Sequence, residues 1–182
     1  MQNSSFIQVH DKTFQIFLTE EKLQQRIVEI AHQLQEEYKE KNPLFIVVLN
    51  GAFMFASDLI KAVNVPCEIA FIRVASYRGM ESSGDLKELL GLQERLEGRD
   101  VIVVEDIIDS GQTMSRLLSD FEAEVPASLR VASLLVKPKQ MKVHVNIDYV
   151  GFEIPGLFVV GYGLDYEGQG RYLKDIYQLK DD

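Results

Sequence analysis

The chain has little cysteine and little positive charge. Cys67 is the single cysteine among 182 residues, so no internal disulfide framework can form, which is typical of a reducing compartment. Lysine and arginine number 19 against 28 aspartate and glutamate residues, giving a formal net charge of −9. Binding to nucleic acid needs clustered basic residues, so this balance disfavours nucleic acid as a partner. It does not disfavour one phosphorylated small molecule, which the backbone N–H groups of a single loop can bind.

Long apolar runs are also missing. No run approaches the roughly 20 residues that a membrane-spanning helix needs, so no membrane partner is expected. Residues 1–5 carry neither the basic cluster nor the apolar core of a signal peptide. These absences predict a cytoplasmic protein. With 182 residues, 46% of them hydrophobic, the chain is expected to form a single domain over 1–182 with a normal core.

Hydrophobic periodicity predicts alternating strands and helices. Continuous apolar runs are typical of strands buried on both faces of a parallel sheet. We expect strands at 14–18, 44–49, 67–75, 101–104, 130–136 and 157–160. We expect helices between Thr19 and Asn42, at 52–63 and at 112–121, and a mobile loop or a long hairpin at 76–85. This alternation predicts an α/β fold with a mainly parallel sheet.

The most informative stretch is 101–113, Val-Ile-Val-Val-Glu-Asp-Ile-Ile-Asp-Ser-Gly-Gln-Thr. A buried strand is expected to end in acids, followed by a short loop and the start of a helix. In such sheets ligands bind beyond the carboxyl ends of the strands, where the first N–H groups of the next helix point at them. Gly111 allows close approach of the backbone, and the hydroxyls of Ser110 and Thr113 add donors. The stretch therefore predicts a pocket for one phosphate monoester.

The acids of this stretch need another role, because their charge would repel a phosphate. Glu105 and Asp106 suit ribose hydroxyls or Mg²⁺, a hard cation that prefers oxygen ligands. The alternative is that Glu105, Asp106 and Asp109 are only turn and helix-capping acids, which strand-loop-helix turns often contain. Three acids together in this one string favour the functional interpretation. The chain has no Gly-x-x-x-x-Gly-Lys-Ser/Thr loop, which disfavours a P-loop nucleotidase.

The same stretch resembles the phosphoribosyl-pyrophosphate signature of the type I phosphoribosyltransferase family, in particular its hypoxanthine-guanine branch. Further stretches match that branch in order: 49–53 its pyrophosphate turn, 76–77 the start of its flexible loop, 134–137 its purine-reading strand end, and 148–171 its nucleobase hood and final strand. The resemblance runs from about residue 44 to residue 171. It implies the type I phosphoribosyltransferase fold, a mainly parallel twisted sheet flanked by helices, with a flexible loop and a small hood built from N-terminal and C-terminal segments.

On the purine side, the resemblance implies a role for each matching residue. Asp109 matches the general base near N7 of the purine, which agrees with the ability of a carboxylate to take or share that proton. Lys137 matches the lysine that donates to the oxygen at C6 and so favours 6-oxopurines. Tyr149 matches the aromatic residue that stacks on the purine, and Val150 the residue whose backbone contacts it.

On the phosphate side, the resemblance implies that Glu105 and Asp106 hold the ribose hydroxyls and the Mg²⁺-bound substrate. The other substrate-binding residues that it implies are Ser110, Gly111, Gln112 and Thr113 at the 5′-phosphate, Asn50, Gly51 and Arg171 at the pyrophosphate, and Ser76 and Tyr77 in the flexible loop. Structural alternatives remain for four residues: a helix N-cap for Asp109, a solvated strand-end lysine for Lys137, core packing for Tyr149 and a surface ion pair for Arg171.

Two positions depart from the commonest pattern of that branch. Asn50 stands where many members have lysine, which removes a cation from the pyrophosphate turn. Gly156 stands where many members have aspartate, so a second magnesium is expected either to rest on substrate oxygens and water alone or to bind weakly. The turn carries a non-proline cis peptide in the family, expected here between Leu49 and Asn50.

The resemblance implies a purine salvage enzyme with Mg²⁺ as its cofactor. It would transfer the 5-phosphoribosyl group of phosphoribosyl pyrophosphate to hypoxanthine or guanine, giving IMP or GMP and pyrophosphate. The alternatives are a phosphoribosyl-pyrophosphate-sensing regulator on the same fold, which the acidic charge and Lys137 disfavour, and an inactive relative, which Asn50 and Gly156 suggest. A homodimer or homotetramer is expected. The sequence does not rank hypoxanthine, guanine and xanthine.

Overall fold

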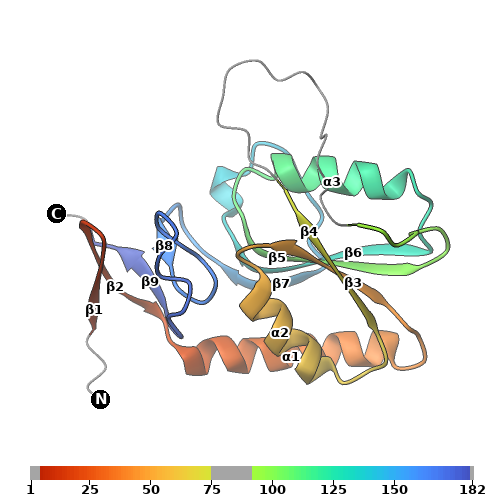
Figure 1. The fold of residues 1–182 in the computed structure, drawn as a ribbon, viewed down its shortest axis with the longest axis horizontal. Coiled ribbons are helices and arrows are strands. Elements are labelled where there is room, and N and C mark those ends of the chain that lie inside the picture. The colour runs from red at the N-terminus through yellow and green to blue at the C-terminus, as the bar shows by residue number, and fades with distance from the viewer. Residues whose placement is uncertain (1–4, 75–91, 181–182) are drawn as a thin grey trace.

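The computed structural model describes residues 5–74 and 92–180, which form two sheets (Figure 1). The main sheet has five parallel strands in the order β4-β3-β5-β6-β7. Their bounds are β3 Leu44–Leu49, β4 Glu68–Arg73, β5 Asp100–Ile108, β6 Ser128–Val136 and β7 Tyr149–Glu153. The second sheet is antiparallel in the order β1-β2-β9-β8, with bounds β1 Phe6–Val9, β2 Lys12–Leu18, β8 Val159–Val160 and β9 Ile176–Leu179. We name it the hood sheet.

Helices cover both faces of the main sheet (Figure 1). Helices α1 (Glu20–Tyr38) and α2 (Phe53–Val63) lie on one face, and α3 (Gln112–Glu122) lies on the other. A short 3₁₀ helix follows β6 at Pro138–Gln140. In β3 the side chains alternate, so Phe45 joins the cluster under α1 and α2 while Ile46 joins the cluster with α3. Coverage of both faces explains the continuous apolar run at 44–49 and confirms the predicted α/β class.

Helix α1 follows the predicted amphipathic pattern. Thr19 caps it, since its side chain accepts a hydrogen bond from the Lys22 N–H, and Glu20 and Glu21 occupy the positive first turn. Its buried residues are Leu23, Ile27, Ile30, Ala31, Leu34 and Tyr38. Among the helices of residues 5–74 and 92–180, none has both the length and the apolarity needed to cross a membrane.

Strand β5 is longer than the sequence predicted. The predicted strand at 101–104 ended before the acids, but β5 continues to Ile108 because Ile107 and Ile108 pair with Leu135 and Val136 of β6. Glu105 and Asp106 therefore lie within a paired strand, and the loop before α3 is shorter than predicted. This pairing gives the two acids a rigid backbone.

The assignment of 148–152 to the hood was wrong. Residues Tyr149–Glu153 form β7, the edge strand of the main sheet, because Tyr149 pairs with Ala132 and Val150 with Ser133 of β6. The Asp148 carboxylate fixes the start of this strand by accepting a hydrogen bond of 2.8 Å from the Val131 N–H. The predicted strand at 157–160 shortens to β8 and lies in the hood sheet.

Candidate active site

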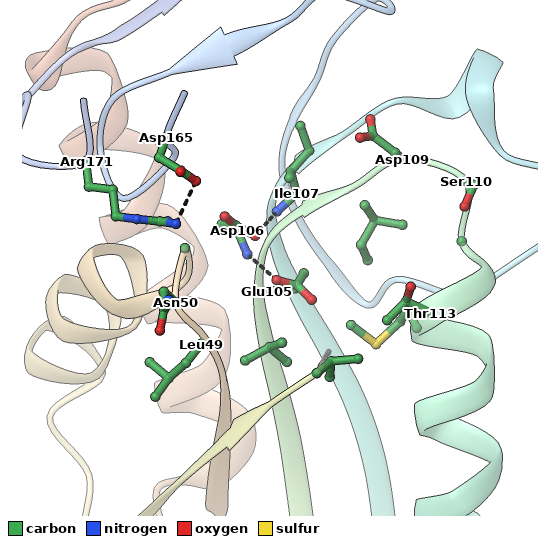
Figure 2. Close-up of a pocket in the computed structure, with 16 residues that line it drawn as sticks. Leu49, Asn50, Glu105, Asp106, Ile107, Asp109, Ser110, Thr113, Asp165 and Arg171 are labelled. Atoms are coloured by element: carbon green, nitrogen blue, oxygen red, sulfur yellow. Dashed lines mark hydrogen bonds and ion pairs between the residues drawn. The ribbon is translucent and has the colours of Figure 1, made fainter. Parts of the chain in front are cut away.

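A cavity of about 360 Å³ opens at the carboxyl ends of β3 and β5 (Figure 2). It is lined by the turn after β3, the end of β5, the start of α3 and two residues that follow β8. Nine of the predicted site residues line it: Asn50, Gly51, Glu105, Asp106, Asp109, Ser110, Gly111, Thr113 and Arg171. Three separate stretches of the chain, at 50–51, 105–113 and 171, thus meet in one place, which favours the functional interpretation over isolated turn acids and helix caps.

The loop between β5 and α3 is shaped to receive an anion. Gly111 caps α3 with a left-handed φ of 75°, and a methyl group added there would lie 2.4 Å from the Val143 carbonyl oxygen. The first turn of α3 contains no acidic residue, so its N–H groups are free of competing charge. Gln112 does not line the cavity. The Ser110 hydroxyl lies 3.5 Å from Oε1 of Gln112 and accepts a hydrogen bond from the Gln112 N–H.

Glu105 and Asp106 form the acidic wall of the cavity. A Glu105 carboxylate oxygen accepts from the Asp106 N–H at 3.1 Å, and Asp106 accepts from the Ile107 N–H at 2.8 Å. Burial raises the pKa of Glu105 well above its usual value, and the neighbouring Asp106 charge raises it further. Burial also raises the pKa of Asp106, although its hydrogen bonds and the charge of Arg171 act in the opposite direction. Such a pair is stabilised by a bound cation or by hydroxyl donors.

The turn after β3 lies directly against this wall. The peptide bond between Leu49 and Asn50 is cis, which confirms the expectation. A methyl group added at Gly51 would lie 1.5 Å from an Asp106 carboxylate oxygen, so this approach is possible only for glycine. The Asn50 side chain is drawn beside the cavity in Figure 2.

Arg171 and Asp165 face the acidic wall from the hood side (Figure 2). Their ion pair joins Arg171 Nη2 to Asp165 Oδ1 at 2.6 Å, and Nη1 donates to the Gly163 carbonyl at 2.6 Å. Asp165 was not among the predicted site residues, and a carboxylate of this kind was expected at the position of Gly156. A methyl group added at Gly156 would instead lie 2.3 Å from Nε2 of Gln140, and Gly156 does not line the cavity. The glycine-flanked stretch that ends in Asp165 was the available signal.

Asp109 and Lys137 meet at the other end of the cavity. Lys137 Nζ lies 2.7 Å from Asp109 Oδ1. Asp109 lines the cavity with its side chain half exposed, whereas Lys137, directly after β6, is buried and does not line the cavity. The structure therefore brings together the predicted general base and the predicted purine-reading lysine.

Tyr149 and Val150 do not reach the cavity, so their predicted placement was wrong. Tyr149 is a core residue, and its hydroxyl donates to the Glu37 carboxylate of α1. The Val150 carbonyl accepts from Arg26 Nη2 at 2.8 Å, also on the α1 side. Both errors follow from the membership of β7 in the main sheet. Ser76 and Tyr77 lie outside the described residues.

An aromatic side chain that the sequence analysis did not single out lies in the hood. Phe158, directly before β8, is 47% exposed. Its ring packs edge-on against Tyr166 with centroids 5.8 Å apart, and Tyr166 adjoins Asp165 in the chain. Phe158 does not itself line the cavity, but its exposed ring lies on the same segment as Asp165 and Arg171, which do.

Comparison with known proteins agrees with this geometry. Residues 16–167 match the phosphoribosyl transferase domain family. The chain is 42% identical over 166 residues to the hypoxanthine-guanine phosphoribosyltransferase of Bacillus subtilis, covering 91% of this chain and 92% of that protein. It is 43% identical over 173 residues to the bifunctional protein TilS/HprT of Listeria monocytogenes, covering 94% of this chain but spanning only 27% of that longer protein.

A solved structure shows the same likeness. A variant hypoxanthine phosphoribosyltransferase from Trypanosoma cruzi, in a ternary complex with substrates, superposes with a TM-score of 0.84 at 41% identity, over 91% of this chain and 94% of that one. This chain belongs to the phosphoribosyl transferase family. The type I phosphoribosyltransferase fold expected from the sequence is thereby confirmed.

The raised pKa of Glu105 predicts that Glu105→Gln stabilises the ligand-free protein at neutral pH by about 1 kcal/mol, the size typical of relieving a functional site. Because the folded-state pKa lies above the ordinary value of 4.5, the wild type loses stability as pH rises from there through the raised pKa. Urea unfolding at about pH 5 and about pH 8 measures this difference. Glu153→Gln, at the exposed end of β7, is the control. If the free energy of unfolding depended on pH in the same way in the wild type and in Glu105→Gln, the raised pKa would not belong to Glu105.

Proposed function

We propose that this protein is a purine salvage enzyme. It transfers the 5-phosphoribosyl group of phosphoribosyl pyrophosphate to hypoxanthine or guanine, with release of pyrophosphate and formation of IMP or GMP. The observation that carries the proposal is one cavity with an acid-free helix start on one side and the Glu105–Asp106 wall on the other. A sugar carrying phosphate groups at both ends needs this combination of an anion-binding loop and oxygen ligands.

Mg²⁺ is the cofactor that this donor set fits. Within 5–74 and 92–180, no group of three or more histidine, cysteine, aspartate and glutamate side chains gathers closely enough to hold a metal alone. Mg²⁺ commonly binds one or two carboxylates and completes its shell with substrate phosphates and water. The raised pKa of Glu105 supports Glu105 and Asp106 as its ligands, since a cation would stabilise both ionised carboxylates. Bound there, Mg²⁺ would neutralise charge on the departing pyrophosphate.

Different residues of the cavity bind different parts of phosphoribosyl pyrophosphate. Residues 110–113, where the loop after β5 meets the first turn of α3, hold the 5′-phosphate through their N–H groups and hydroxyls. Arg171, fixed by Asp165 and the Gly163 carbonyl, presents its guanidinium to the pyrophosphate on the opposite side. The ribose then lies over the acidic wall between these two anchors, and the attacking N9 of the purine approaches C1 as pyrophosphate leaves.

Asp109 and Lys137 act on the purine. Asp109 takes or shares the N7 proton as N9 attacks, a general-base role that its place on the cavity wall allows. Lys137, 2.7 Å from Asp109, donates a hydrogen bond to an oxygen at C6 of the purine. Adenine has an amino group at C6, which is also a donor, so Lys137 disfavours adenine. We assign stacking on the purine to the exposed Phe158 in place of the buried Tyr149. Stacking adds affinity with little choice among purines.

The remaining expectations stay proposals. A homodimer or homotetramer is supported by the edge strand β4, which leaves Ile69 and Phe71 45% and 52% exposed. A cytoplasmic location is supported by the single cysteine. The regulator is not favoured, because the acidic charge opposes nucleic-acid binding. Asp165 supplies the carboxylate that Gly156 lacks, which removes one of the two reasons for proposing an inactive relative.

A spectrophotometric assay tests the activity directly. The full chain with phosphoribosyl pyrophosphate and Mg²⁺ is expected to convert hypoxanthine or guanine and to leave adenine unchanged. A metal chelator is expected to stop the reaction, and added Mg²⁺ to restore it. Absence of turnover with hypoxanthine, guanine and xanthine would refute the proposed function.

Asp109→Asn is expected to lower kcat tens-fold or more, on the order of a general-base effect, because asparagine cannot accept the N7 proton. Binding of IMP, measured by titration calorimetry, is expected to remain. Asp120→Asn, the same change on the exposed side of α3, is the matched control and leaves kcat at the wild-type value. A wild-type rate in Asp109→Asn would remove Asp109 from the mechanism.

A further inference from the structure

Tyr162 is a buried hood residue with an unusual backbone and a well-defined partner. It is 4% exposed and has a φ of 49°, a left-handed value that bulky side chains rarely adopt. Its hydroxyl donates to Asp58 of α2 at 2.6 Å. A conformation of this kind persists only where surrounding contacts hold it. The bond to Asp58 and the packing of the ring in the core under α1 and α2 supply those contacts.

Asp58 is itself held in place from several sides. Gln24 Nε2 of α1 donates to the same carboxylate oxygen at 2.7 Å, and Lys61 Nζ lies 2.8 Å from the other oxygen. Asp58 lies one and a half turns into α2, the helix that begins directly after the turn at 50–51. The Tyr162 bond therefore ties the hood segment to the same rigid helix that carries the pyrophosphate turn.

Gly163, the residue after Tyr162, lies in close contact with the turn at 50–51. A methyl group added at Gly163 would lie 2.1 Å from the Gly51 carbonyl oxygen, so backbone meets backbone at this point. Gly163 also exchanges hydrogen bonds with Arg171: its N–H donates to the Arg171 carbonyl at 3.0 Å, and its carbonyl accepts from Arg171 Nη1 at 2.6 Å. Displacement of Gly163 would therefore move Arg171, and with it the ion pair to Asp165 (Figure 2).

We propose that the hydrogen bond from Tyr162 to Asp58 positions the guanidinium of Arg171 against the turn at 50–51, and so sets the affinity for the pyrophosphate end of the substrate. This inference rests on the proposed function. Tyr162 and Asp58 line no part of the cavity and are positioning residues, which act through Gly163. Purine binding at Asp109 and Lys137, on the far side of the cavity, does not depend on them.

Tyr162→Phe tests the proposal, since it removes the hydroxyl and keeps the buried ring. We expect the KM and the Kd for phosphoribosyl pyrophosphate to rise about three- to tenfold, the size of one typical intramolecular hydrogen bond. We expect kcat and the KM for hypoxanthine to change less than about twofold. Tyr177→Phe is the matched control, because its buried hydroxyl lies 3.3 Å from Asp175 of its own segment and does not bridge to α2.

Two variants of Asp58 complete the test. Asp58→Ala is expected to raise the same KM, and combining it with Tyr162→Phe to add nothing further. Asp58→Asn keeps an acceptor oxygen for Tyr162, so the KM for phosphoribosyl pyrophosphate is expected to stay at the wild-type value. The proposal is overturned by an unchanged KM for phosphoribosyl pyrophosphate in Tyr162→Phe, by an equal rise with Tyr177→Phe, or by additive effects in the double variant. An inactive wild type would refute the proposed function instead, so the two failures are distinguishable.

Discussion

Two adjacent carboxyl groups at the end of β5 are the constraint around which the cavity is arranged. Glu105 and Asp106 are held in a paired strand, in a place where burial raises the pKa of both. A free chain would place these acids in water, where their ionisation costs nothing. Ionising the two buried carboxyl groups therefore costs free energy in the folded protein, and a cation or a hydrogen-bond donor on the ligand would reduce that cost. Gly51 approaches Asp106 so closely that only glycine fits there, and the charge of Arg171 lowers the pKa of Asp106 against the effect of burial.

The cavity separates two kinds of electrostatic environment over a short distance. The start of α3 presents N–H groups, has no acidic residue in its first turn and suits a phosphate. The wall beside it presents carboxylates and suits a cation or hydroxyl groups. An overall charge of −9 does not prevent this division, because the anion-binding end relies on backbone dipoles and on Arg171. Local geometry thus decides which ligand binds, in a chain whose composition disfavours anions in general.

Patterns that depend on local chemistry could be predicted from the sequence. The apolar run of β3, the amphipathic α1 and the start of α3 after Gly111 each follow from neighbouring residues, and they lie where expected. Long-range pairing could not be predicted in the same way. Strand β7 belongs to the main sheet because of its register with β6, which its own five residues do not reveal. Because 148–152 was assigned to the hood, Tyr149 and Val150 were wrongly predicted to contact the purine. Asp165 was missed because a glycine-rich segment shows no period that would indicate which side chain turns inward.

A crystal structure with IMP bound tests the central claim most directly. The account predicts the 5′-phosphate against residues 110–113, the ribose over Glu105 and Asp106, and the purine beside Asp109 and Lys137. Density for the nucleotide elsewhere, with the loop at 110–113 empty, would contradict it.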